Sequence, residues 1–166
     1  MIILGIDPGT TSIGYAVLDG DSRNPRLLDS GLLPIHSVPA QDRLVELHTQ
    51  MDKVIRQWKP VFVSVEKIYF AKNIKTAVSV SEARGVILLT AALAGITLYE
   101  YTPLTIKKIV TGDGNADKMQ VQKMVRLTLQ ETESLRSQDD VFDAIASALC
   151  CFYQEGRTGY SRSKYI

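Results

Sequence analysis

Two short runs of apolar residues in the first half of the chain each end in a single carboxylate. Residues 2–6 are followed by Asp7, and residues 61–65, with one serine among them, are followed by Glu66. Continuous runs of this length, rich in β-branched side chains, are typical of strands buried on both faces. An acid at the end of such a strand is costly to bury unless it is paired or bound to a metal. The pattern therefore predicts two buried strands that bring their acids to one edge of a sheet.

The rest of the pattern predicts a mixed α/β domain. Further strands are expected at residues 13–18, about 27–35 and 96–101. Short turns between the first three strands favour antiparallel neighbours. Apolar residues recur at helical spacing over residues 44–58, and a second helix over residues 76–93 is apolar nearly all round. Such a helix must be covered on two sides, so one side is expected to meet a second subunit.

A last helix, expected over residues 137–153, carries a pair of acids. Asp140 and Asp143 are three positions apart, which places them on one face of the helix. Together with Asp7 and Glu66 they can form a group of four carboxylates at one sheet edge. Oxygen ligands of this kind suit Mg²⁺ or Mn²⁺, and two such ions suit cleavage of a phosphodiester bond.

Composition and charge narrow the class of protein. A chain of 166 residues, 45% hydrophobic and 22% charged, is typical of one soluble domain, expected over residues 1–155 with a flexible basic tail at 156–166. No apolar run approaches the roughly 20 residues of a membrane span, so a cytoplasmic location is expected. Residues 67–126 hold nine basic and four acidic residues, although the whole chain carries a net charge of only +1. This asymmetry favours an anionic polymer as partner.

The turn after the first strand is compatible with a second class of enzyme. Residues 7–11 have the form Asp-x-Gly-Thr-Thr, which resembles the phosphate-binding turn of the actin and sugar-kinase superfamily. Those enzymes have two such halves and generally a much longer chain, and the sequence has no second turn of this kind. A kinase is therefore the weaker hypothesis.

Several separated motifs together resemble the RuvC family of Holliday junction resolvases. They occur in order as E-K-I-Y-F-A-K-N (residues 66–73), A-R-G (83–85), Y-T-P-L-T-I-K-K (101–108), G-D-G (112–114), K-M-Q-V-Q (118–122) and D-V-F-D-A-I-A (140–146). Each motif is weak alone, but the set is specific and covers about residues 2–152.

The resemblance implies a ribonuclease H-like fold, with a five-stranded mixed sheet flanked by helices. It implies a homodimer that makes paired cuts in a four-way DNA junction, in homologous recombination and DNA repair. A branch-migration motor complex is left open as a further partner. By position the resemblance assigns two Mg²⁺ ions, for which Mn²⁺ can substitute, to four catalytic acids: Asp7, Glu66, Asp140 and Asp143. Family spacing selects Asp140 over its neighbour Asp139.

The resemblance also implies where DNA binds. It assigns backbone contacts to Lys107 and Lys118 and base stacking to Tyr69, where the family often has Phe. Lys72, in the same basic loop as Tyr69, is expected to contact DNA as well. Two alternatives stay open. A non-catalytic junction-binding module would not need the four acids, and a nuclease acting on RNA–DNA hybrids would not need the apolar helix or Tyr69.

Overall fold

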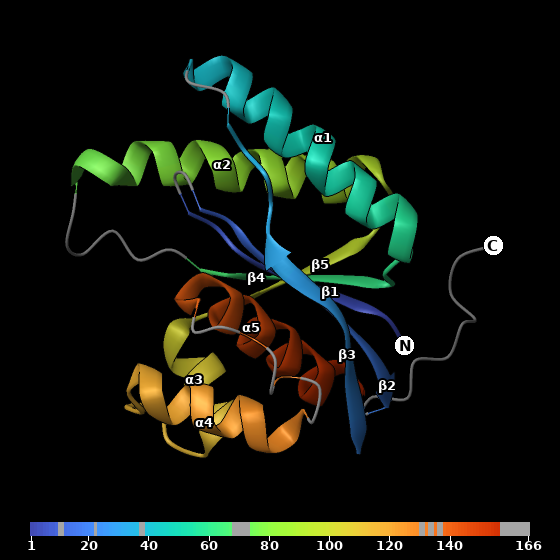
Figure 1. Cartoon of the computed structure of the whole chain (residues 1–166), viewed down its shortest axis with the longest axis vertical. Coiled ribbons are helices and arrows are strands. Elements are labelled where there is room, and N and C mark those ends of the chain that lie inside the picture. The colour runs from blue at the N-terminus through green and yellow to red at the C-terminus, as the bar shows by residue number, and fades with distance from the viewer. Residues whose placement is uncertain are drawn as a thin grey trace.

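The two apolar runs that end in acids form neighbouring strands of a five-stranded sheet. Figure 1 shows the computed structural model, which describes residues 1–9, 12–21, 23–36, 39–67, 74–129, 132, 135 and 138–156. The strands within these residues are β1 (Ile3–Asp7), β2 (Gly14–Asp21), β3 (Asn24–Leu32), β4 (Phe62–Glu66) and β5 (Thr97–Tyr101). The helices are α1 (Ala40–Trp58), α2 (Ile74–Leu93), α3 (Pro103–Thr111), α4 (Lys118–Thr128) and α5 (Asp139–Glu155).

The order of the strands in the sheet is β3-β2-β1-β4-β5. The pairs β1–β2 and β2–β3 are antiparallel, whereas β1–β4 and β4–β5 are parallel. This mixed sheet and its antiparallel first three strands confirm the sequence prediction. Because Ile6 of β1 pairs with Val65 of β4, the acids that follow these two residues lie at the same edge of the sheet.

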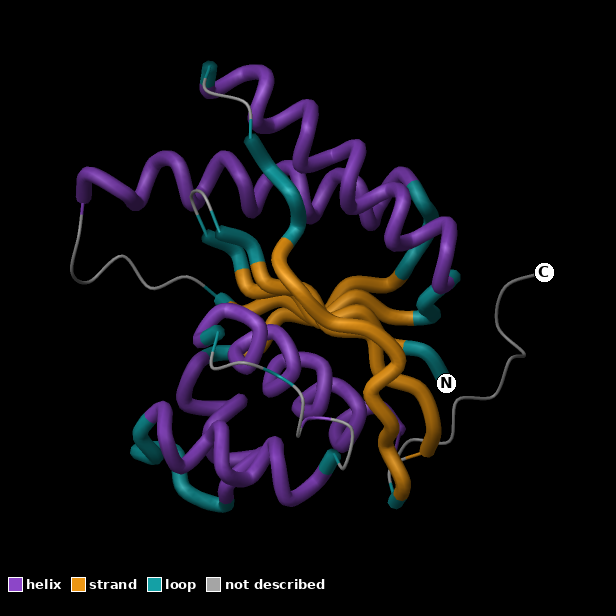
Figure 2. The backbone as a smooth tube through the Cα atoms, viewed as in Figure 1, coloured by secondary structure: helices purple, strands orange, loops and turns teal. Residues whose placement is uncertain are grey.

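Helices cover both faces of the sheet, as Figure 2 shows. α1 and α2 lie on one face, and α3, α4 and α5 lie on the other. Side chains of β1 alternate between the two layers: Leu4 packs in the core with α1 and α2, and Ile3 packs in the core with α5. From Val141 to Phe152, every residue of α5 except Asp143 is buried. The one partly exposed residue in this buried stretch is therefore an acid.

Small residues allow α5 to lie directly against the sheet. A Cβ added at Gly5 would lie 2.2 Å from the carbonyl oxygen of Ala144, and one added at Gly14 would lie 2.0 Å from the carbonyl oxygen of Asp140. Both distances are far inside van der Waals contact, so neither position accepts a side chain without movement of the helix. This backbone contact places the first two turns of α5 over the end of β1.

Some predicted boundaries differ from the structure. The third strand begins at Asn24 rather than near residue 27, because Asn24 and Pro25 extend the pairing with β2 beyond an irregularity between Val17 and Leu18. Gly20 and Pro25 are typical of turns, so the sequence indicates a loop where these residues pair as strands. In the described part of the chain, no helix combines the length and apolarity that a membrane span requires. The expected tail lies, from residue 157 onward, outside the described residues.

Candidate functional site

Three elements bring the four predicted acids together at the edge of the sheet. Asp7 is the last residue of β1 and Glu66 is the last residue of β4. Asp140 and Asp143 lie in the first two turns of α5, which packs across these strands. Burial and, after it, charge repulsion from Asp143, Glu66 and Asp140 together raise the pKa of Asp7 to about 8. All four carboxylates are therefore close enough to interact.

Glu66 and Asp143 show the same effect. Burial and then Asp143 raise the pKa of Glu66 to about 7, although Lys107 and Lys118 oppose that rise. Burial also raises the pKa of Asp143, against the opposing effect of Lys118. Carboxylates that raise one another's pKa lack sufficient positive charge nearby. The group is therefore suited to a cation, and perturbed acids gathered in this way are typical of functional sites.

Asp140 is held by a residue that the sequence did not indicate. The Oγ of Ser12, in the turn between β1 and β2, donates a hydrogen bond to Oδ2 of Asp140. A serine in a turn has no distinctive spacing, so only the contact of α5 with this turn reveals the pair. Asp140 thus faces the end of β1, while Asp139 faces α4, where Gln122 donates a hydrogen bond to it.

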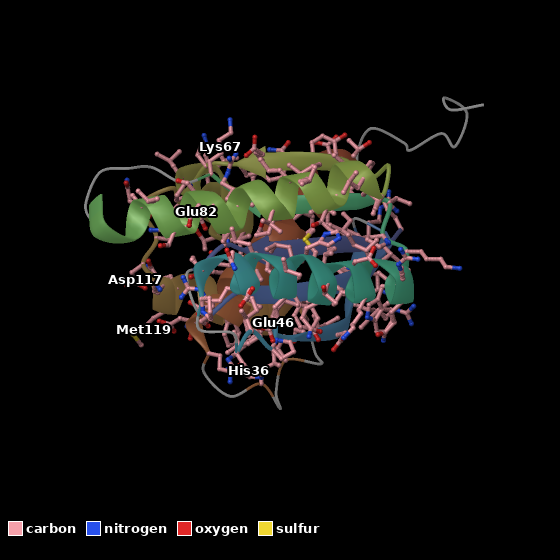
Figure 3. All side chains as sticks on the ribbon, turned by 90° about the horizontal axis from the view of Figure 1, so that it is seen from above. His36, Glu46, Lys67, Glu82, Asp117 and Met119 are labelled. Atoms are coloured by element: carbon pink, nitrogen blue, oxygen red, sulfur yellow. The ribbon has the colours of Figure 1, made fainter. Side chains whose placement is uncertain are left out.

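The two lysines lie on the helices that follow β5. Lys107 is on α3, and Lys118 is the first residue of α4. A capping box fixes the start of α4, since Asp117 Oδ1 accepts from the Gln120 amide and Gln120 Oε1 accepts from the Asp117 amide, each at 2.8 Å. Figure 3 labels Asp117 and Met119, which flank Lys118. Glu66, Lys107, Lys118 and Asp143 all line one cavity of about 240 Å³.

The remaining predicted DNA contacts cannot be placed. Tyr69 and Lys72 lie outside the described residues. The chain enters this segment at Lys67, whose amide donates a 2.8 Å hydrogen bond to the carbonyl of Tyr101. Lys67 follows Glu66 and is labelled in Figure 3. The expected loop therefore starts directly beside the acids.

The donor chemistry of the site fits a hard divalent cation, although the side chains are not arranged around one. Among the residues that the structure describes, no three His, Cys, Asp or Glu side chains are placed so that they could hold a metal ion. The four acids nevertheless offer only oxygen donors, which Mg²⁺ and Mn²⁺ prefer. The raised pKa values of Asp7 and Glu66 indicate that an added positive charge would be stabilised there.

Comparison with known proteins identifies the family. The family model described as crossover junction endodeoxyribonuclease RuvC matches residues 3–151. The chain belongs to the RuvC family. The RuvC proteins of Halothermothrix orenii and Roseiflexus sp. are 44% and 43% identical to it over 151 residues, which is 90% of this chain and 91% and 89% of theirs. The resemblance noted in the sequence is thereby confirmed, and the kinase hypothesis is set aside.

Solved structures agree with this assignment. RuvC of Thermus thermophilus, solved in complex with a Holliday junction substrate, superposes with a TM-score of 0.85 at 33% identity, covering 92% of this chain and 94% of that one. The yeast mitochondrial Holliday junction resolvase Ydc2 superposes with a TM-score of 0.70 at 13% identity and shares the fold. The predicted ribonuclease H-like fold is confirmed.

Proposed function

We propose that this protein is a structure-selective endonuclease that resolves four-way (Holliday) DNA junctions in homologous recombination and DNA repair. The observation that carries the proposal is the meeting of four acids at one sheet edge in a chain that matches the RuvC family from residue 3 to residue 151. The Thermus thermophilus relative, 33% identical, was solved with a Holliday junction substrate. A protein that only binds junctions would not need these four acids, so their presence favours catalysis.

The acids would serve as metal ligands. Asp7, Glu66, Asp140 and Asp143 would hold two Mg²⁺ ions, with Mn²⁺ as a substitute, and when bound these ions supply Lewis acidity at the scissile phosphate. The chain provides the rest. Buried β1 and β4 fix Asp7 and Glu66, and Ser12 orients Asp140 by its hydrogen bond. The sheet and α5 hold the backbone of these ligands, so their side chains are what would have to rearrange around an ion.

The lysines would bind the DNA backbone. Lys107 and Lys118 line the same cavity as Glu66 and Asp143, so a phosphate bound to either ammonium would lie next to the acids. Neutralising phosphate charge also releases counterions, which favours binding of any DNA. Tyr69 is proposed to stack on a base at the crossover and Lys72 to contact the backbone, because both follow Glu66 within the motif shared with the family.

A homodimer is the proposed assembly, and the exposed face of α2 supports it. Val78, Leu89 and Leu93 on this helix are 62%, 56% and 70% exposed. They lie at positions that share one side of the helix, with Gly85 between them, where an added Cβ would meet nothing. A symmetric dimer through this face would cover these apolar side chains and provide one active site for each of the two DNA strands to be cut.

Three substrates distinguish this function from its alternatives. The protein is incubated with Mg²⁺ and a labelled four-way junction, a linear duplex or an RNA–DNA hybrid. We expect paired cuts in the junction alone, with nicks that DNA ligase can seal because the ends are 5′-phosphate and 3′-hydroxyl. Cleavage of the hybrid would instead favour an RNA-directed nuclease. Junction binding without cleavage would favour a non-catalytic module. Asp7→Asn serves as the matched control for contaminating nuclease.

A further inference from the structure

Asp139 connects α5 to α4 through two polar contacts. Its Oδ1 accepts a 3.0 Å hydrogen bond from Nε2 of Gln122, and its Oδ2 lies 3.4 Å from Nζ of Lys118. Lys118 and Gln122 are four residues apart on α4, so their side chains share one side of that helix. Asp139 therefore contacts the start of α4 rather than the strand ends.

Lys118 has a second acidic partner inside the proposed metal site. Its Nζ lies 3.6 Å from Oδ2 of Asp143 as well as 3.4 Å from Oδ2 of Asp139. Within the described ranges, Lys118 is the one cation that forms ion pairs with these acids. Its charge also lowers the pKa of Asp7 and of Glu66, although by less than burial raises them. The ammonium group thus supplies positive charge to the site.

In this arrangement Lys118 and a bound metal ion would compete for Asp143, and Asp139 offers Lys118 another partner. A divalent cation bound to Asp143 would take the carboxylate that Lys118 now contacts and would repel the ammonium. Asp139 and Asp140 are adjacent in α5, so their side chains are about 100° apart around the helix axis. Because Asp140 faces Ser12 and the end of β1, Asp139 is left on the side of α4. It offers the ammonium a partner outside the metal site.

We propose that Asp139 is a positioning residue for Lys118, which accepts its ammonium when a metal ion takes Asp143. The inference rests on the metal-binding role proposed above. Held in this way, Lys118 stays beside the site, where it can bind a DNA phosphate, instead of extending into solvent. Gln122 assists by fixing the Asp139 carboxylate through the other oxygen.

The test is a double-mutant cycle on metal affinity, measured without DNA. Mn²⁺ is titrated calorimetrically into the full chain and into Asp139→Asn, Lys118→Met and the double variant. Lys118 is 63% and Asp139 54% exposed, so their interaction is that of a surface ion pair. We therefore expect Asp139→Asn to weaken Mn²⁺ binding about two- to fivefold. Lys118→Met removes the competing cation and should increase the affinity for Mn²⁺.

The decisive comparison is the effect of Asp139→Asn in the protein with Lys118 and in the Lys118→Met variant. In Lys118→Met, the further change of Asp139 to Asn should have no effect on Mn²⁺ affinity, because the residue that Asp139 positions is gone. An equal loss in both backgrounds would overturn the proposal, since it would indicate direct ligation or a general effect of the lost charge. Equal affinity of Asp139→Asn and the unchanged protein would overturn it as well.

Two further variants separate positioning from misfolding. Asp139→Glu retains the charge and should recover part of the affinity, whereas Gln122→Leu should cause a smaller loss in the same direction without any change of charge. Loss of affinity in Gln122→Leu but not in Asp139→Asn would contradict the proposal. If the unchanged protein binds no Mn²⁺, the proposed metal site fails together with this inference. If it binds Mn²⁺ and cuts junctions while the cycle shows no coupling, only the inference fails.

Discussion

Ser12 donates a hydrogen bond to the Asp140 carboxylate across 128 positions of sequence. The bond joins the turn that follows Asp7 and β1 to the first turn of α5, which carries Asp140. Both elements therefore meet through a polar contact in addition to the close backbone approach at Gly14.

Ser12→Ala is expected to slow junction cleavage about tenfold, because Asp140 loses a hydrogen bond to a charged group. Ser12→Thr retains the hydroxyl and should stay within about threefold of the unchanged protein. Single-turnover cleavage of one synthetic junction with Mg²⁺ measures both. Equal rates for Ser12→Ala and the unchanged protein would show that this bond does not orient the acid.

Replacing Asp7, Glu66 or Asp143 with its amide should abolish cleavage and leave junction binding largely intact. The acids are proposed to hold metal, while the lysines supply most of the affinity for phosphate. Cleavage assays and gel-shift titrations on the same junction test this. Full activity in any one variant would remove that residue from the site.

The stability of the metal-free protein should fall as the pH rises from about 4 to about 8. Asp7 and Glu66 have pKa values of about 8 and about 7 in the folded chain, above their ordinary values of 3.8 and 4.5. In this range the folded state holds protons that the unfolded state has released, so rising pH favours unfolding. Thermal unfolding in a chelator, compared between the protein and Asp7→Asn, measures the effect. The pH dependence should be shallower in Asp7→Asn, and an identical slope would contradict the assigned cause.

Leu89→Lys should convert the proposed dimer to a monomer, since it places a charge in the exposed apolar face of α2. Leu127→Lys is a matched control, because Leu127 is 69% exposed but lies on α4, in the opposite layer. Light scattering at micromolar concentration reports the mass of each. A monomeric unchanged protein, even with junction bound, would exclude the dimer.

Tyr69→Ala should lower cleavage more than junction affinity, and Tyr69→Phe should be nearly silent. Stacking of one aromatic side chain on a base is worth about 1–3 kcal/mol and needs the ring rather than the hydroxyl. Single-turnover rates and gel shifts for the two variants decide the point. If Tyr69→Phe is as slow as Tyr69→Ala, the hydroxyl and not the ring is responsible.

The sequence predicts the site best where an acid follows or interrupts a regular pattern of apolar residues. Asp7 and Glu66 stand out because each follows a run of mostly apolar residues, and such runs form central strands whose ends meet when the strands are parallel neighbours. The pair Asp140 and Asp143 was found because its spacing matches the helical period. Their roles as metal ligands stay predictions, as do those of the two lysines, Tyr69 and Lys72.

Contacts between distant segments could not be predicted in this way. Ser12 lies in a short turn, and the partners of Asp139 lie on a different helix, so neither has a local spacing that signals its contact. Both depend on how α5 packs against the rest of the molecule. The start of β3 differs from its prediction for another reason, since Gly20 and Pro25, which are typical of turns, pair with each other at the ends of β2 and β3.

The direct contact of α5 with Gly5 has a consequence for how this enzyme can be altered by protein engineering. The Ala144 carbonyl that touches Gly5 is adjacent in sequence to Asp143, so the distance between helix and strand also sets the distance between acids. A side chain introduced at Gly5 would shift the acids as it disturbed the core. Variant libraries that seek new substrate preferences are therefore better aimed at α4 and the segment after Glu66 than at this contact.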